Sequence, residues 1–440
     1  MDAPALRTPL ILRNRNMFLI WSGQALSQMG TRMYQIALAW WIVTTGGGGK
    51  EVGLFMVAGA LPALAFVKVI GKTVDRHRSR GVLIACDLCA FATTAVVVLL
   101  FRAERLGFAG ACVAGFFLAL AQAFFDPALS KAVAEAAAPE DLEAAVAFQS
   151  STQSLASFAG AMAGALLIDR IGILGVIILN ALSFLVSAGA NGLLDIPPAV
   201  RAATPAAAPA GHPIPQAPDS SAGAASAWET LRQTPWLKKV LIGFGCVNFF
   251  LTPILVVLPL YVKITLGGTA TWLGCLEAAI WLGILAGTFA SRWVPTGAVR
   301  KEIRPDGACG TSDTAGGTVP GVLRLGAACM LLLGVALVLP GVFVHGGLFG
   351  AALFCAGCAV GVNNVKFITL FQERVRPELK GRFFALMQAL LSFTFPAAFF
   401  LFGLLAEIVA PPKVCLIQAF GVLALSGYFL RLSQTTEVRP

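Results

Sequence analysis

Long apolar segments recur along the whole chain, separated by short polar connections. An apolar α-helix of about 20 residues is long enough to cross the roughly 30 Å hydrocarbon core of a bilayer. The pattern predicts twelve such helices, at residues 17–44, 52–70, 82–101, 107–128, 144–168, 171–194, 238–263, 270–292, 322–344, 347–372, 383–408 and 412–431. We therefore predict an all-α membrane protein.

One long segment interrupts this pattern near the middle of the chain. Residues 195–227 are rich in Ala and Pro and lack hydrophobic periodicity, which predicts a disordered cytoplasmic linker. The next residues, WETLRQTPWLKK, are typical of a short amphipathic segment at the membrane surface. The prediction is two six-helix bundles, 1–194 and 238–440, joined by 195–237. Transporters built from parallel repeats have this organisation, in which one half moves against the other around a central site.

Composition supports a membrane location. The chain is 57% hydrophobic and 12% charged, about half the charged fraction of ordinary soluble domains. Its net charge of +10 comes from basic residues that gather in alternate loops, which argues against a nucleic-acid partner. The positive-inside tendency then predicts both termini in the cytoplasm and an inner-membrane location. The N-terminus lacks a cleavage site after a brief apolar core, so we expect the first helix to be retained.

The ten cysteines do not suit an external disulfide, because nine of them fall inside predicted spans and Cys309 falls in a cytoplasmic loop. Two pairs, Cys86 with Cys89 and Cys355 with Cys358, have a metal-ligand spacing. Small polarizable side chains also pack well between membrane helices, and zinc sites usually bring further ligands. We expect packing and no metal, with a thiol-based metal exporter as the alternative.

The connection between the second and third predicted spans is dense in charge, VIGKTVDRHRSRGVLIACD at 69–87. The positive-inside tendency accounts for its basic residues but not for Gly71 or Asp75. Gly71 lacks a side chain and would let a neighbouring helix approach closely. Asp75 could accept hydrogen bonds from a helix N-terminus, where the dipole favours a carboxylate. Such a contact would close the cytoplasmic side in one state and break in the other.

An acidic stretch lies close to this connection in the predicted topology. It begins with Asp126 before Pro127, and continues with Glu135, Glu140, Asp141 and Glu143. These carboxylates could pair with Arg76 or Arg80 and complete a cytoplasmic gate. A solvated loop is the alternative.

The stretch GKTVDRHRSR resembles the signature between the second and third helices of the major facilitator superfamily. Three further segments are similar to its drug, macrolide and siderophore exporters, the enterobactin and macrolide efflux group: LIWSGQALSQMGTRMYQIALAWWIV, FFDPALSKAVAEAAAPEDLEAAVAFQS and FQERVRPELKGRFFALMQ. The resemblance covers nearly all of the chain apart from the linker. It implies twelve helices and solute export.

Three positions depart from the family pattern. Ser79 stands where the signature usually has an arginine, and Ala161 stands where the Gly-rich antiporter stretch of the fifth helix usually has proline. Many relatives carry an acid near Thr31, and this chain has none there. This last departure argues against proton coupling through the first helix.

Polar residues inside the spans are the candidate site residues, because each needs a partner, a cavity or a route to the interface. Gln24, Gln28, Arg32 and Gln35 recur at helical spacing on the first span. By the resemblance, this helix borders the central cavity, so the stripe resembles a substrate wall. The alternative is hydrogen bonding between helices, with Arg32 reaching outward. A second group, expected to bind substrate on the tenth span, comprises Asn363, Asn364 and Lys366.

Glu277 is the carboxylate placed clearly inside the second half. Desolvation can raise the pKa of such a group into the physiological range, so we expect proton coupling there. A static ion pair, for example with Arg32, is the alternative. Asp87 and Lys68 lie near the cytoplasmic surface, where we expect structural pairing or snorkelling.

These features predict a secondary transporter that exports an amphipathic organic solute by alternating access, coupled to proton entry. No phosphate-binding G-x-x-x-x-G-K-[ST] motif occurs, so ATP is not the expected energy source, and we expect no cofactor. An enzyme is not expected, because the three histidines are scattered and no H-E-x-x-H occurs. An importer or facilitator of a small organic anion is the alternative. The expected partners are a small-molecule substrate, protons and the lipid bilayer, with the protein acting as a monomer.

Overall fold

The computed structural model describes residues 14–138, 141–195, 235–295, 319–375 and 379–437, and every regular element in these ranges is a helix. Nearly all of the predicted linker lies outside the described residues, as do Glu140 and Cys309. The chain forms two compact units. The first comprises residues 1–217 with 268–278, and the second comprises 218–267 with 279–440.

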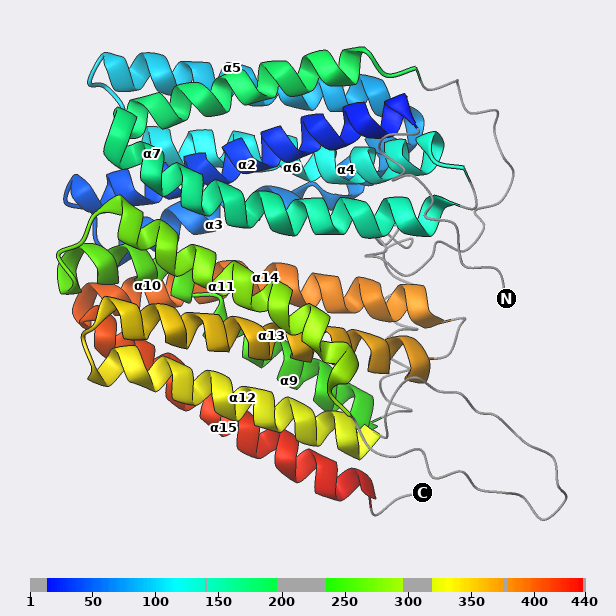
Figure 1. The fold of residues 1–440 in the computed structure, drawn as a ribbon, viewed down its shortest axis with the longest axis vertical. Coiled ribbons are helices and arrows are strands. Elements are labelled where there is room, and N and C mark those ends of the chain that lie inside the picture. The colour runs from blue at the N-terminus through cyan, green and yellow to red at the C-terminus, as the bar shows by residue number, and fades with distance from the viewer. Residues whose placement is uncertain (1–13, 139–140, 196–234, 296–318, 376–378, 438–440) are drawn as a thin grey trace, which may run out of the picture. The chain divides into compact units, whose positions relative to one another are not determined.

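The first unit contains six helices of the N-terminal half (Figure 1), namely α2 (Arg15–Thr44), α3 (Gly49–Ala65), α4 (Val67–Arg76), α5 (Ser79–Arg102), α6 (Phe108–Ala136) and α7 (Leu142–Gly192). The long α7 is two limbs, because Gly172 has φ of 74° and interrupts the helical backbone. A positive φ of this kind costs glycine little, whereas a side chain would strain it. Gly172 therefore separates the fifth and sixth predicted spans.

The second unit begins with α9 (Pro235–Leu251), α10 (Ile254–Leu260) and the π-helical turn η2 (Tyr261–Thr265). Together these three elements occupy the residues of the single predicted span 238–263. Proline has no N–H to donate, so Pro253 and Pro259 interrupt the regular hydrogen-bond ladder along this span. The remaining elements are α11 (Ala270–Ala290), η3 (Ser291–Trp293), α12 (Val319–Val342), α13 (Gly346–Arg374), α14 (Lys380–Ile408) and α15 (Pro411–Glu437).

Each of the twelve predicted spans corresponds to a helical segment. Nine described helices are long and apolar enough to cross a membrane, and one of them contains both limbs of α7. The pair α3 and α4, bent by 56°, supplies a further span. The remaining segment is α2, which is long enough to cross a membrane but contains the polar residues Gln24, Gln28, Arg32 and Gln35. The prediction of an all-α membrane fold is therefore confirmed, and the helical segments of the described residues are consistent with twelve crossings.

Two glycine pairs bring α11 and α13 together in the second unit. A Cβ built on Gly287 would lie 2.1 Å from the carbonyl oxygen of Cys358, and one built on Gly361 would lie 2.3 Å from that of Ile284. Gly283 and Gly357 make equally close backbone contacts one turn away. Small residues four apart allow two membrane helices to pack backbone to backbone. In the segment CAGC, Gly357 and Cys358 are thus part of a packing surface.

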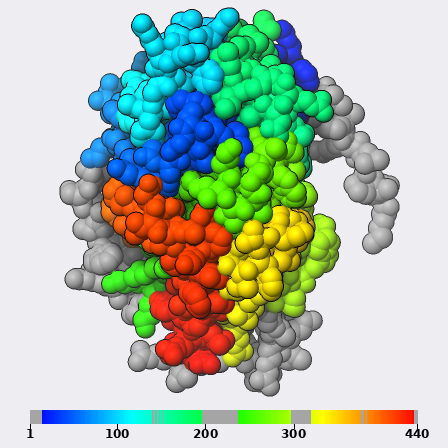
Figure 2. Space-filling view, turned by 90° about the vertical axis from the view of Figure 1, so that its left-hand side faces the viewer, coloured from blue at the N-terminus to red at the C-terminus, as the bar shows by residue number. Residues whose placement is uncertain are grey.

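The same unit has an aromatic core between α9, α13 and α15. The ring centroid of Phe367 in α13 lies 6.2 Å from that of Phe244 and 5.3 Å from that of Phe429. Both Phe367 and Phe429 are almost completely buried. Helix α12 packs beside α15, and Figure 2 shows their yellow and red surfaces in contact. These contacts hold the second unit together by apolar packing.

The glycine contact predicts a large cost for added volume. In Gly287→Leu the new side chain meets backbone that cannot rotate away, so we expect a loss of about 1–3 kcal/mol or more and a lower unfolding temperature in detergent. The matched control is Gly427→Leu in α15, because nothing lies within 4 Å of a Cβ at Gly427. Thermal unfolding of the two purified variants tests this, and an equal midpoint for both would show that the contact is not tight.

Candidate functional site

The polar stripe of α2 runs from a fully buried end to an exposed end. Gln24 is 2% exposed, Gln28 and Arg32 are half-buried, and Gln35 is exposed. The Nε2 atom of Gln24 and both amide atoms of Gln28 are buried without a hydrogen-bond partner among the described residues. Hydrocarbon offers no partner either, so leaving such atoms unpaired costs several kcal/mol. This stripe is therefore the strongest candidate for contact with a polar solute.

Arg32 forms an ion pair with Glu277 within the first unit. Its Nη2 atom lies 2.7 Å from Oε2 of Glu277, and its Nη1 atom donates to Oε1 of Gln35 at 2.9 Å. The two paired side chains are only 16% and 8% exposed. Each charge offsets the desolvation of the other, which an isolated ion inside a membrane lacks. The sequence-based alternative for Glu277, an ion pair with Arg32, is the arrangement that the structure contains.

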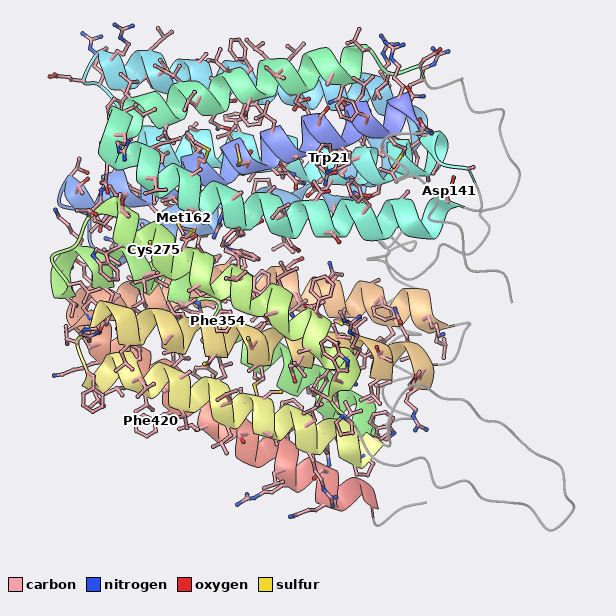
Figure 3. All side chains as sticks on the ribbon, viewed as in Figure 1. Trp21, Asp141, Met162, Cys275, Phe354 and Phe420 are labelled. Carbon is pink, nitrogen blue, oxygen red and sulfur yellow. The ribbon has the colours of Figure 1, made fainter. Side chains whose placement is uncertain are left out.

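The start of α11 reaches Arg32 because Gly274 lets it pack against α7. A Cβ built on Gly274 would lie 2.1 Å from Cβ of Ala165 and 2.8 Å from the carbonyl oxygen of Ala161. Figure 3 labels Met162 and Cys275 on these two helices. The close approach brings α11 to α7 one turn before Glu277. Ala161, which departs from the family pattern, contributes its backbone to this contact.

A capping interaction strengthens the same junction. The Oδ2 atom of Asp169 in α7 accepts the backbone N–H of Thr271 at 3.0 Å and also accepts the Thr271 hydroxyl. A carboxylate at this place satisfies an N–H group that has no partner within the first turn of α11. Asp169 therefore anchors the helix that carries Glu277. No local sequence signal marks Asp169, because its partner lies 102 residues away in the chain.

Both limbs of α7 support α2 on its other sides. A Cβ built on Gly160 would lie 2.7 Å from the carbonyl oxygen of Met29, and one built on Gly164 would lie 2.8 Å from Cα of Met33. Gly30 of α2 in turn packs against Ser183 in the second limb. The Gly-rich stretch of the fifth span thus holds the stripe of α2 at a defined depth and rotation.

The second predicted substrate group lies on α13 in the second unit. Asn363 is 4% exposed, and its Oδ1 atom has no hydrogen-bond partner among the described residues. Asn364 is half-buried. Lys366 donates from Nζ to the carbonyl oxygen of Val294, just after η3, at 3.0 Å. This bond occupies the Lys366 ammonium at the end of a neighbouring helix.

The predicted gate residues have varied surroundings in the first unit. Arg80 donates at 2.9 Å to the carbonyl oxygen of Leu194 and also donates to that of Gly192, at the C-terminal end of α7. A helix C-terminus favours a cation, so this bond ties α5 to α7. Asp126 accepts from Nε2 of Gln122 at 2.6 Å. Asp75 and Arg76 are exposed, and nothing lies within 4 Å of a Cβ built on Gly71.

Two further anchors fix the connection between α4 and α5. Lys131 of α6 donates from Nζ to the carbonyl oxygens of Val74 and His77, at 2.8 and 2.9 Å. The hydroxyl of Ser79 donates to the carboxylate of Glu135. Ser79, where the family signature usually has an arginine, thus contacts the acidic stretch directly, at Glu135 in α6. The sequence indicated a position near the gate for Glu135, but neither its partner Ser79 nor the role of Lys131 has a local sequence signal.

Asp87 is buried more deeply than the sequence indicated. It is 2% exposed, and its Oδ2 atom accepts from Oγ of Ser187 at 2.8 Å and from Nδ2 of Asn191 at 2.9 Å. The expected structural pairing is present, with amide and hydroxyl donors from α7. Ser187 and Asn191 lie four residues apart, so their shared face on a helix was the sequence signal for this cluster.

In the part of the chain that the structure describes, no group of three or more His, Cys, Asp or Glu side chains could hold a metal ion. The Cys86 and Cys89 side chains differ in exposure, since the first is buried and the second is exposed.

The ion pair predicts a characteristic mutational pattern. Arg32→Gln leaves the Glu277 carboxylate buried without its cation, so we expect a loss of about 3–5 kcal/mol. The double variant Arg32→Gln with Glu277→Gln carries no buried charge and should recover much of this loss. Unfolding midpoints of the purified single and double variants measure the coupling. Additive effects of the two substitutions would contradict a direct pair.

Comparison with known proteins agrees with this architecture. The sequence model of the Major Facilitator Superfamily matches residues 20–399. Macrolide efflux protein A of Streptococcus pyogenes is 23% identical over 398 residues, covering 89% of each chain, and its namesake in Enterococcus faecalis is 23% identical over 357 residues, covering 79% of this chain and 99% of its own.

Solved structures share the fold at low identity. The nucleoside transporter NupG has a TM-score of 0.69 at 12% identity, covering 95% of this chain and 98% of its own. A bacterial homologue of the human lysosomal transporter Spinster, solved in an inward-facing and unoccupied conformation, has a TM-score of 0.70 at 12% identity, covering 96% of this chain and 97% of its own. From its helices and the extent of the family match, the chain belongs to the Major Facilitator Superfamily.

Proposed function

We propose that this multi-pass membrane transporter exports an amphipathic organic solute, drug-like or siderophore-like, by alternating access. The observation that carries the proposal is the buried polar stripe of α2, with its unpaired amide atoms and the Arg32–Glu277 pair. A closed helical bundle would lose stability by keeping such atoms unpaired, whereas a solute path needs them. Export is supported by the relatives named macrolide efflux protein A. We also propose an inner-membrane location with both termini cytoplasmic, which the distribution of basic residues among the loops supports.

Each part of the stripe has a distinct role in this proposal. Gln24 and Gln28 present amide groups that can bind hydroxyl or carbonyl groups of the solute. Gln35 holds the Arg32 guanidinium when the carboxylate is neutral, since the Nη1 bond does not depend on Glu277. On the second unit, we assign Asn363, Asn364 and Lys366 to the solute path.

Coupling to protons follows from competition at Glu277. A proton and a hydrogen-bond donor of the solute both need the carboxylate oxygens, so each weakens the binding of the other. Mutual exclusion of this kind gives antiport: a proton arriving from outside releases the solute, and solute binding from inside releases the proton. A proton or a solute donor on the Glu277 carboxylate breaks the ion pair with Arg32. Binding is thereby linked to a change at the junction of α2 and α11.

The cytoplasmic gate comprises Gly71, Asp75, Arg76, Arg80 and Asp126. Arg80 fastens α5 to the end of α7, and Lys131 fastens the connection after α4 to α6. This fixed frame presents Asp75 as an exposed carboxylate. We assign Asp75 to a contact that closes the cytoplasmic side and breaks when that side opens.

Transport in everted membrane vesicles tests the function. With an acidic interior we expect uptake of at least one compound from a panel of macrolides, siderophores and dyes, and loss of that uptake when the gradient is collapsed. Glu277→Gln should reduce gradient-driven uptake about tenfold or more, whereas the exposed Glu104→Gln should not. Uptake that survives both gradient collapse and Glu277→Gln would disprove proton coupling at Glu277.

The gate predicts a change in accessibility. Asp75→Asn removes the charge that favours the closed cytoplasmic side, so a single cysteine at Ser130→Cys, near the cytoplasmic end of α6, should react faster with a maleimide. Arg102→Gln, at the opposite end of α5, is the control and should leave the labelling rate unchanged. Identical labelling rates in the Asp75→Asn and parent backgrounds would remove Asp75 from the gate.

A further inference from the structure

A groove on the first unit has walls from α4, α5 and α6 and a volume of about 750 Å³. This volume is within the range of about 300–1,000 Å³ typical of ligand sites. On the α5 side the lining contains a row of small residues four positions apart, namely Gly81, Ala85, Cys89 and Thr93, with Val82 and Cys86 beside them. On the α6 side three of the four lining residues are bulky, namely Phe117, Leu120 and Phe124, and the fourth is Ala121. The small residues leave a channel beside the aromatic wall.

The groove has the length of one membrane leaflet. From Gly81 to Thr93, α5 rises about 18 Å at 1.5 Å per residue. Half of the bilayer core is about 15 Å thick. The groove begins at the polar connection between α4 and α5 and follows a membrane-spanning helix, so it reaches from the membrane surface to about the bilayer centre. An acyl chain anchored at the surface has the same path.

A cation stands at the surface end of this groove. Arg78 lines it, together with His77, directly before α5 begins. Two nearby cations are already engaged, since Arg80 donates to the end of α7 and Lys131 donates to the carbonyl oxygens of Val74 and His77. The Arg78 guanidinium has no hydrogen-bond or ion-pair partner among the described residues. A guanidinium binds phosphate in two-point geometry, and the first-turn N–H groups of α5 add to the attraction.

We propose that this groove binds a phospholipid with an anionic headgroup, its phosphate at Arg78 and one acyl chain between α5 and α6. Charge complementarity and length both favour this occupant. The neighbouring basic residues Lys72 and Arg76 add attraction for an anionic over a zwitterionic headgroup. The bound lipid would brace the connection that Lys131 and Ser79 hold in place, and so stabilise the first unit. This site is separate from the α2 stripe and does not depend on the proposed function.

Unfolding midpoints in detergent, with phosphatidylglycerol or phosphatidylcholine added to the full chain, test the site. Phosphatidylglycerol should raise the midpoint of the parent protein more than phosphatidylcholine does. Arg78→Gln should raise about tenfold the phosphatidylglycerol concentration that is required to shift the midpoint. Ala85→Phe, which fills the groove, should abolish the shift. Arg102→Gln at the other end of α5 and Ala92→Phe, whose residue lies outside the groove lining, are matched controls and should respond as the parent does.

A second measurement does not rely on these variants. Cys89 is exposed and lines the groove, so in a chain that retains it as the single cysteine, phosphatidylglycerol should slow maleimide labelling. An unchanged labelling rate, or equal stabilisation of all five proteins by phosphatidylglycerol, would overturn the proposal. So would protection of Cys89 by a macrolide or dye but not by lipid, which would make the groove a solute site.

Discussion

Every polar group inside these helices must find its partner within the protein or its cargo, because the bilayer core offers no hydrogen bonds. Asp87 meets this requirement through Ser187 and Asn191, and Arg32 meets it through Glu277 and Gln35. The Nε2 atom of Gln24 and both amide atoms of Gln28 do not meet it within the described residues. We propose that this difference marks the α2 amides as groups available to a solute.

Close backbone packing makes these partnerships possible. The helices approach one another at glycines, as Gly274 does against α7 and Gly287 does against α13. Each contact fixes the depth and rotation of a helix, and therefore the position of the polar side chain it carries. Glu277 reaches Arg32 because Gly274, one turn earlier on α11, has no side chain. Packing and electrostatics in this protein are thus two parts of one arrangement.

The same reasoning distinguishes three kinds of cation in the first unit. Arg32 is paired inside the membrane, and Arg80 and Lys131 bind carbonyl oxygens at helix ends. Arg78 faces the lipid-side groove. The positive-inside tendency explains why all basic residues of the connection are favoured at the cytoplasmic surface, but not what each one binds. Their individual roles depend on which carbonyls, carboxylates and cavities lie within reach.

The sequence by itself determined the helices and the family. Hydropathy is a local property, so twelve apolar segments and the break between the limbs of α7 could be recognised residue by residue. The sequence also limited Glu277 to two roles, proton coupling or an ion pair, because a buried carboxylate must be either protonated or paired with a cation. Tertiary structure decided the partners: Ser187 and Asn191 for Asp87, the end of α7 for Arg80, and Thr271 for Asp169. These partners lie about 100 residues apart in the chain, and only the packing of helices at small residues brings them together.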